Sequence, residues 1–236
     1  MLLLGIETAT RRVGVVVASE DGMLGRVELG GHADDGPPRH AERLVPAIQY
    51  CFEQLGVPLD HVSAIAVDVG PGMFTGLRVG VTTAKVLAQA LRVPMIPVPS
   101  LDLLAYPLRH ARTLIVPAID ARRNELYYAL YRAVPGGVQR ASDYEMGSPE
   151  DLIAELEARG EETLLCGDGV LRFAKLFGDV ERVDLAGPAH AAPSLAALAE
   201  LAIARYEREE FCGPDGVLPL YLRKSDAELG FDRKEG

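Results

Sequence analysis

The residues best suited to chemistry lie in one glycine-rich stretch from Gly70 to Gly80, which reads Gly-Pro-Gly-Met-Phe-Thr-Gly-Leu-Arg-Val-Gly. It joins an apolar run that predicts a buried strand to a pattern that predicts a helix. Backbone amides at a helix start can bind an anion, and glycines let a ligand or a partner backbone approach closely. The stretch lacks Gly-Lys-Ser/Thr, so it is not a nucleotide P-loop, and its spacing is not that of the dinucleotide fingerprint. By shape alone, a tight turn that packs the helix onto the sheet is favoured over an anion site.

Three carboxylates, those of Glu7, Asp68 and Asp120, stand at the ends of predicted strands. Acids in such positions can hold magnesium beside a phosphate group, because Mg²⁺ prefers oxygen ligands. Strand ends also carry acids that have no function, so both interpretations stay open. The segment from Asp120 to Glu125 mixes both signs of charge and indicates a structured turn in preference to a site.

His40 is the histidine placed best for chemistry, because it stands at the start of a predicted helix. A metal site on a helix needs a second ligand one turn further on. Arg43 and Leu44 occupy those positions, so we predict no zinc or iron site and expect His40 to be a cap or contact residue. Nucleophilic catalysis has no better candidate, since there is no Gly-x-Ser-x-Gly elbow and no cysteine in a recognisable nucleophile setting.

Two helices must position these groups. The first is predicted over about 39–55 with Gly56 as its C-cap, and Pro46 should kink it or break its first turns. The second is predicted over about 75–91. Its apolar residues recur with the 4, 3, 4, 3 spacing of a heptad seam, at Leu77, Val81, Ala84, Ala88 and Leu91. The seam either packs in the core of its own lobe or forms an intermolecular bundle with the first helix, and periodicity alone favours the core.

The remaining elements alternate between strand-rich and helical stretches. Strands are predicted over 2–7, 13–18, 23–29, 63–69, 113–119, 125–134 and 163–166, with a further strand after the turn at 135–137. Helices are predicted from Ser100, after the N-cap Ser148 and over 194–206. Residues 30–39 are predicted to be an exposed loop. Two strand-rich starts, each followed by helices, predict an N-terminal lobe at 1–100, a C-terminal lobe at 101–222 and a polar tail at 223–236.

Composition narrows the function classes. The chain has 236 residues, of which 48% are hydrophobic and 25% charged, so it can bury a sizeable core. The formal net charge of -10 argues against a broad nucleic-acid footprint, which needs clustered Lys and Arg. The three cysteines have no CxxC spacing, which argues against a disulfide framework or a zinc knuckle. With no signal-peptide pattern and no apolar run long enough to span a bilayer, we predict a cytoplasmic protein.

Five short motifs occur in order along nearly the whole chain and resemble one known family. They are Ile6-Glu7-Thr8-Ala9-Thr10, His40-Ala41-Glu42-Arg43-Leu44-Val45-Pro46, the Gly70–Gly80 stretch, Ile119-Asp120-Ala121-Arg122 with Glu125 and Tyr127, and Pro219-Leu220-Tyr221-Leu222-Arg223. The sequence resembles the TsaB (YeaZ) family, bacterial proteins required for placing a threonylcarbamoyl group on an adenosine beside the tRNA anticodon. The resemblance implies an α/β fold of the actin/Hsp70-like (ribonuclease H-like) type, with two lobes of mixed sheets flanked by helices.

The resemblance further implies a non-catalytic scaffold or dimerisation subunit, a paralogue of the catalytic subunit TsaD. Such a subunit pairs with a TsaD-type protein through helices of the N-terminal lobe, helps to recruit a TsaE-type ATPase, and meets tRNA only through the complex. No membrane partner and no cofactor are expected on this chain, since ATP and metal belong to the partner subunits. The helix seam thereby gains an intermolecular role, and the same helices are expected to form a homodimer when the chain is alone. The partner interface is expected at His40, Leu44, Ile48, Cys51, Leu77, Val81, Ala84, Ala88 and Leu91.

Two departures from the family pattern weaken any intrinsic nucleotide hydrolysis. Glu7 replaces the usual Asp, and Met73 replaces the usual Ser, so a phosphate–metal site would be disturbed. A vestigial nucleotide site is expected at Glu7, Thr8 and Asp68. The alternative function is a free-standing actin-like ATPase or phosphotransferase that uses these acids. A metalloprotease-like hydrolase is opposed by Leu44, where the TsaD pattern has a second metal-binding histidine. The family's motif turn comprises Gly70, Pro71, Gly72, Phe74, Thr75, Gly76 and Arg78.

Overall fold

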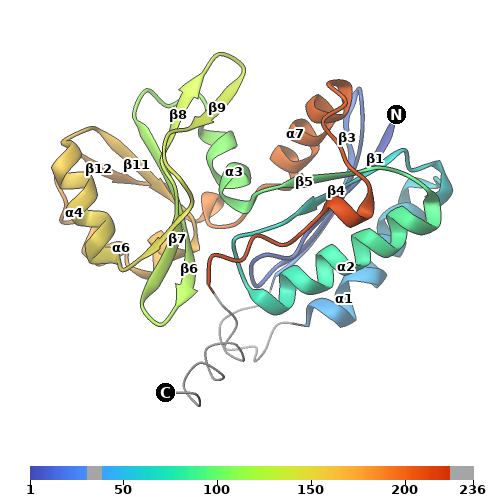
Figure 1. Ribbon diagram of the computed structural model, residues 1–236, viewed down its shortest axis with the longest axis horizontal. Helices are drawn as coiled ribbons and strands as arrows, with labels where there is room; N and C mark the ends of the chain where they lie inside the picture. Colours follow the sequence, from blue (N-terminus) through green and yellow to red (C-terminus); the bar gives the residue numbers. More distant parts are fainter. Residues whose placement is uncertain (31–38, 224–236) are drawn as a thin grey trace.

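The computed structural model describes residues 1–30 and 39–223, which form two lobes side by side (Figure 1). Residues 31–38 of the loop predicted over 30–39, and residues 224–236 of the tail predicted over 223–236, lie outside the described residues. Each lobe is built on its own β-sheet. The first sheet has the strand order β3-β2-β1-β4-β5, and its strands are β1 (Leu2–Glu7), β2 (Val13–Ser19), β3 (Gly22–Leu29), β4 (Ala64–Asp68) and β5 (Met95–Val98).

Helices cover both faces of the first sheet. Strand β1 pairs antiparallel with β2 and parallel with β4, so side chains alternate between the two faces along each strand. Val15 and Val17 of β2 pack under α1 (His40–Leu55) and α2 (Phe74–Leu91). Val16 and Ala18 pack on the opposite face, under α7 (Leu195–Glu207). A strand that is buried on both faces has a continuous apolar sequence, and such a run predicted β4 from the sequence.

Pro46 does not break α1, which runs without interruption from His40 to Leu55, so the prediction of broken first turns is wrong. A proline inside a helix removes the hydrogen bond to the carbonyl four residues earlier, here that of Glu42. Pro46 and Glu42 are both exposed, so water can take the place of that bond. The apolar side of the helix, at Leu44, Ala47 and Ile48, stays on the sheet.

The second lobe holds a seven-stranded mixed sheet with the main order β10-β7-β6-β11-β12, and β8 pairs with β6 and β9. Its strands are β6 (Leu114–Arg122), β7 (Glu125–Tyr128), β8 (Tyr131–Val134), β9 (Gly137–Arg140), β10 (Glu145–Gly147), β11 (Thr163–Cys166) and β12 (Val183–Leu185). Its helices are α3 (Ser100–Ala105), α4 (Pro149–Arg159), α5 (Asp168–Arg172) and α6 (Ala174–Phe177). Short 3₁₀ turns span Leu59–His61, Tyr106–Leu108, Pro188–His190 and Pro214–Gly216.

The single strand predicted over 125–134 is in fact two strands, β7 and β8. Both keep one antiparallel register on β6, with Tyr128 opposite Ala118 and Tyr131 opposite Ile115. Between them the backbone N–H of Leu130 donates to Ser142 Oγ at 3.0 Å, and the Leu130 carbonyl accepts from the N–H of Ala141 at 2.7 Å. The ladder is therefore interrupted because Leu130 bonds to the segment before β10 instead of to β6.

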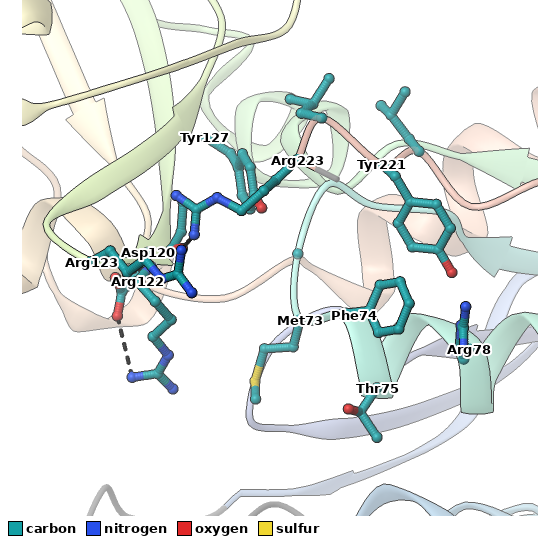
Figure 2. A pocket seen from close by; sticks show the side chains of 14 residues that line it. Met73, Phe74, Thr75, Arg78, Asp120, Arg122, Arg123, Tyr127, Tyr221 and Arg223 are labelled. Carbon is teal, nitrogen blue, oxygen red and sulfur yellow. Dashed lines mark hydrogen bonds and ion pairs between the residues drawn. The ribbon is translucent and has the colours of Figure 1, made fainter. Parts of the chain in front are cut away.

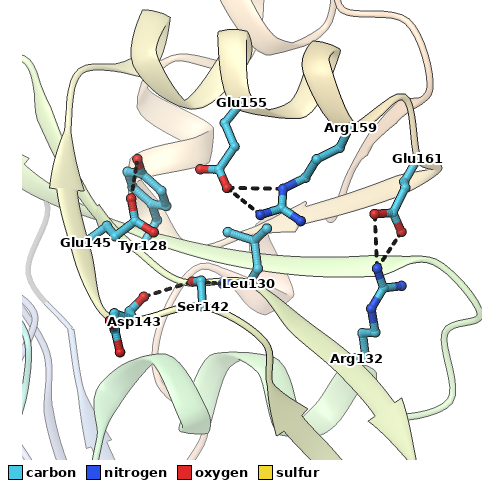
Figure 3. A network of polar contacts seen from close by, with 9 residues as sticks. All are labelled: Tyr128, Leu130, Arg132, Ser142, Asp143, Glu145, Glu155, Arg159 and Glu161. Atoms are coloured by element: carbon cyan, nitrogen blue, oxygen red, sulfur yellow. Dashed lines mark hydrogen bonds and ion pairs between the residues drawn. The ribbon is translucent and has the colours of Figure 1, made fainter.

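Polar contacts on the outside of the second lobe surround α4 (Figure 3). Ser148 Oγ accepts from the N–H of Asp151 at 3.1 Å while the Asp151 carboxylate accepts from the N–H of Ser148 at 2.9 Å. Ser148 is thus the N-cap that the sequence predicts, and the two bonds together form a capping box. Arg159 donates to Glu155 one turn earlier, and Arg132 of β8 donates to Glu161 beyond the helix. Exposed ion pairs of this kind contribute at most about 1 kcal/mol each, so the cap matters more than the pairs.

The chain returns to the first lobe at its end, so a C-terminal lobe of 101–222 is wrong for its last stretch. Helix α7 packs on the first sheet, and Cys212 forms a β-bridge with Met95 of β5. The segment 217–223 then crosses between the lobes. Its Val217 is buried in the first core, whereas Leu222 packs against the second, and Arg223 donates to the Ala121 carbonyl at 2.9 Å.

Two mixed sheets flanked by helices, one in each lobe, make up the two-lobed arrangement that the family resemblance implies. Within residues 1–30 and 39–223, no helix has the length and apolar character that crossing a bilayer requires.

Candidate functional site

The glycine-rich turn packs the start of α2 against the loop between β1 and β2. A Cβ added at Gly72 would overlap the carbonyl oxygen of Ala9, and one at Gly76 would overlap that of Thr8. The N–H of Met73 donates to the Ala9 carbonyl at 2.7 Å, and Thr8 Oγ1 donates to the Gly76 carbonyl at 2.8 Å. The tight-turn interpretation is therefore confirmed, since these glycines permit contact between two backbones.

His40 is a buried contact residue of this junction. Its Nε2 lies 2.7 Å from the Thr10 carbonyl, and a Cβ at Gly76 would lie 3.1 Å from its Cε1. Burial lowers the pKa of His40, and its hydrogen bonds to backbone oppose that shift. Across the described ranges, 1–30 and 39–223, no three His, Cys, Asp or Glu side chains gather in a group that could hold a metal.

The residues of the predicted nucleotide site, Glu7, Thr8 and Asp68, are all buried. Glu7 accepts from the N–H of Ala9 at 2.7 Å. Asp68 Oδ1 accepts from Ser100 Oγ at 2.5 Å and from the N–H of Gly70 at 2.8 Å. Burial raises the pKa of Asp68 to about 7, and burial together with the charge of Asp68 raises the pKa of Glu7 well above its ordinary value. These acids hold loops together, and none of them lines the cleft described below.

The predicted interface residues lie in the core of the first lobe. Eight of the nine side chains are buried, and only Leu91 is partly exposed. They face their own sheet because the apolar stripes of α1 and α2 are the surfaces that cover it. The predicted interface residues are therefore not available on the surface for contact with a partner. The exposed residues of the same helices include Val45, Tyr50 and Val86.

A cleft of about 500 Å³ opens between the lobes (Figure 2). The start of α2 forms one wall, the β6–β7 turn forms the opposite wall, and the crossing segment closes the top. The lining residues are Gly72, Met73, Phe74, Thr75, Arg78, Asp120, Ala121, Arg122, Arg123, Tyr127, Leu220, Tyr221, Leu222 and Arg223.

The two walls differ in chemistry. On the first lobe, the Phe74 and Tyr221 rings lie 4.9 Å apart, and the Arg78 guanidinium stacks 4.0 Å from the Phe74 centroid. On the second lobe, the Asp120 carboxylate pairs with Arg122 at 3.5 Å and with Arg172 at 2.6 Å. Figure 2 shows Arg122 and Asp120 across the cleft from Phe74. An aromatic wall that faces a guanidinium wall can hold a flat, anionic group.

Sequence reasoning placed Phe74, Thr75 and Arg78 in one motif, and all three line this cleft. It missed the second wall, since the segment from Asp120 to Glu125 was interpreted as a turn only. That segment does form the turn between β6 and β7, and its arginines still reach the cleft. Two consecutive arginines in a tight turn, together with the motif around Tyr221, were the signal that could have indicated it.

These features define a class: a two-lobed protein of actin-like fold with an arginine-lined cleft between its lobes. A family model described as "TsaD: tRNA N6-adenosine threonylcarbamoyltransferase" matches residues 36–231. The tRNA threonylcarbamoyladenosine biosynthesis protein TsaB of Bacillus subtilis is 29% identical over 97% of this chain and 96% of its own. TsaB of Escherichia coli is 30% identical over 72% of each chain. The solved structure of YeaZ from Pseudomonas aeruginosa superposes with a TM-score of 0.76 at 29% identity, over 94% of this chain and 99% of its own. The chain belongs to the TsaB (YeaZ) family, which is related to TsaD.

Proposed function

We propose that this chain is a non-catalytic scaffold subunit required for threonylcarbamoylation of the adenosine beside the tRNA anticodon. Membership of the TsaB family supports a role in this tRNA modification, since the relatives are named for threonylcarbamoyladenosine biosynthesis. The catalytic partner is a TsaD-type protein, and a TsaE-type ATPase joins the complex. ATP and metal belong to those subunits, and tRNA is met through the assembly.

The observation that carries the scaffold proposal is the exposed apolar surface of α1 and α2. Val45 and Tyr50 of α1 and Val86 of α2 are 49%, 56% and 60% exposed. The two helices pack side by side on one face of the sheet (Figure 1), and these three side chains are exposed, whereas the apolar stripes of the same helices are buried against the sheet. Exposed apolar side chains on neighbouring elements can mark a protein–protein contact. The interface is accordingly proposed on the outer side of the two helices instead of at their buried seam.

The alternative of a free-standing ATPase has no support from the first lobe's acids. Glu7 and Asp68 are buried and accept hydrogen bonds from their own loops. A carboxylate that must hold magnesium beside a phosphate group needs access to solvent and ligand.

Size-exclusion chromatography with light scattering tests the proposal, with the chain alone and mixed with the TsaD-type protein of the same organism. We expect a stoichiometric complex with wild type and with Leu176→Asp, which changes an exposed apolar residue of the second lobe. We expect no complex with Val86→Asp, because a buried unpaired charge at a contact costs about 2–5 kcal/mol. No complex with wild type, with or without the TsaE-type ATPase and ATP, would contradict the scaffold role. A Val86→Asp variant that still co-elutes would contradict this surface only.

A further inference from the structure

Strand β3 forms the outer edge of the first sheet and pairs with β2 on one side only. Among the residues that the structure describes, no strand pairs with its other side. The backbone N–H and C=O groups along such an edge can form a ladder with another chain, and proteins usually protect the edge by keeping it short or by placing proline in it. β3 is eight residues long and contains no proline. Its free side is therefore suited to pairing with a further strand.

The regular part of β3 runs from Gly25 to Leu29. It lies opposite residues 13–17 of β2 without a break in register. The register shifts between Val17 and Ala18, so the pairing with β2 is irregular at the start of β3. An irregularity of this kind bends a strand and can terminate pairing. A partner strand can accordingly extend the ladder over the regular part.

A second copy of the chain can supply this partner strand only in certain registers. When two identical edge strands pair antiparallel in one continuous sheet, they are related by a two-fold axis that stands perpendicular to the sheet. Side chains alternate between the two faces of a strand, so a residue can oppose only a residue that points to the same face. The pairing is therefore centred on one residue, which lies opposite its own copy.

Charge selects the centre of the pairing. Centring on Arg26 or on Glu28 would place like charges directly opposite each other, which is destabilising. Centring on Val27 places Arg26 of each copy opposite Glu28 of the other, and both side chains are exposed. Centring on Val27 also pairs the whole of the regular part, whereas a centre at Gly25 or Leu29 pairs one of its residues only. The sequence of the strand is thus complementary to itself in one register.

The remaining pairs of this register combine a large side chain with a small one. Gly25 lies opposite Leu29 of the second copy, on the face of the sheet where Val27 and Leu29 pack against the first core. A Cβ added at Gly25 would lie 3.4 Å from Leu55 and 3.5 Å from Cys51, two side chains of α1. Because glycine leaves this place open, the leucine of the second copy can cover both side chains and extend the apolar core across the edge.

The ion pair that Glu28 already makes is compatible with this pairing. Arg12 Nη1 lies 3.6 Å from Glu28 Oε1, and the two side chains are 44% and 35% exposed. Exposed pairs of this kind contribute little to stability. A carboxylate has two acceptor oxygens, so Glu28 can accept from Arg12 and from Arg26 of the second copy together.

We propose that the free edge of β3 is an interface between two copies of this chain, paired antiparallel about Val27 with Arg26 of each copy on Glu28 of the other. The two first-lobe sheets then form one continuous sheet. The inference goes beyond the scaffold role and does not depend on it, because the exposed residues proposed for the other partner take no part. It moves self-association from the helices, where the family resemblance places it, to the edge strand.

Sedimentation velocity of the full chain, over a range of concentrations, tests the interface by charge reversal. Arg26→Glu leaves two acids on the strand, Glu28→Arg leaves two bases, and Arg26→Glu/Glu28→Arg exchanges the charges. Arg112→Glu makes the same change of charge at an exposed residue outside β3 and serves as the control. Val86→Asp perturbs the helix surface instead. Thermal unfolding first confirms that each variant is folded.

We expect wild type, Arg112→Glu and Val86→Asp to form dimers with the same dissociation constant. In either single variant of the strand, the dissociation constant should rise about tenfold or more, which corresponds to about 1.4 kcal/mol, because both cross-strand charge pairs become repulsive. An equimolar mixture of Arg26→Glu and Glu28→Arg should dimerise like wild type, since every acid of one strand then faces a base of the other. The double variant should do so by itself.

A wild type that stays monomeric at every concentration, or single variants that dimerise unchanged, would overturn the proposal. Dimers that are lost in Val86→Asp and retained in the charge variants would place self-association on the helices, which also overturns it. Because the experiment contains no TsaD-type protein, these outcomes leave the scaffold role to its own test.

Discussion

Replacing Gly76 by alanine should destabilise the protein even though alanine is the better helix former. Gly76 lies in the first turn of α2, where glycine costs up to about 1 kcal/mol relative to alanine. The added methyl group would overlap the Thr8 carbonyl and press on the His40 ring at 3.1 Å. Both neighbours are fixed, because Thr8 Oγ1 is bonded to the Gly76 carbonyl and His40 Nε2 to the Thr10 carbonyl.

Overpacking against fixed backbone costs up to about 3 kcal/mol, so the net loss after the gain in helix propensity is about 2 kcal/mol. For a chain of this size that corresponds to a fall in Tm of roughly 4–8 °C. Differential scanning calorimetry measures it, with Gly213→Ala as the matched control. Gly213 has a φ of -72°, and a Cβ added there would have no atom within 4 Å. The Tm of the Gly213→Ala variant should therefore stay within about 2 °C of that of wild type. An unchanged or higher Tm for Gly76→Ala would show that the junction is not closely packed.

Three further substitutions test other parts of the fold. Asp68→Asn should flatten the pH dependence of stability. Burial raises the pKa of Asp68 in the folded protein to about 7, so wild type loses stability as the pH rises from about 4 through 7. The free energy of unfolding, measured with urea at about pH 5 and pH 8, should therefore differ less between the two pH values in the variant than in wild type. Parallel profiles for both proteins would contradict the assignment. Ser148→Ala should lose about 1 kcal/mol in urea unfolding, and Asp151→Ala in the same background should add little because the capping box is already broken. Leu198→Ala should lose about 2–5 kcal/mol because its side chain is fully buried on the first sheet, whereas Leu218→Ala, at a residue 72% exposed, should change stability by less than about 0.5 kcal/mol. Equal losses for the two leucines would refute the packing of α7.

Local patterns predicted most elements because their causes are local. Ser148 followed by proline and acids specifies a helix start, and the run from Ala64 to Asp68 specifies a buried strand. The break between β7 and β8 has no such signal, since it depends on a hydrogen bond between Leu130 and Ser142. The apolar seam of α2 showed which side chains would be buried. It did not show whether the chain's own sheet or a partner protein would cover them. Periodicity alone favoured the core of the lobe, which the structure confirms, and the resemblance moved the expectation away from it.

The cleft shows a second limit of sequence reasoning. Its walls come from segments about 50 and 100 residues apart, and only the fold brings Arg78, Arg122 and Tyr221 together. Charge patterning along the chain could not show that arginines from separate segments converge, because the overall acidic balance conceals them.

The return of α7 to the first sheet has a consequence for how the protein is made. The five strands of that sheet leave the ribosome once residue 98 has emerged, but the helix that covers their second face ends at Glu207. At bacterial or eukaryotic elongation rates the interval is roughly 5–20 s. Throughout it, Leu3, Val16 and Ile96 have no cover from the helix, although all three are fully buried in the finished molecule. The nascent chain thus exposes an aggregation-prone apolar face of the sheet until α7 is synthesised. A chain truncated before α7 would keep that face exposed.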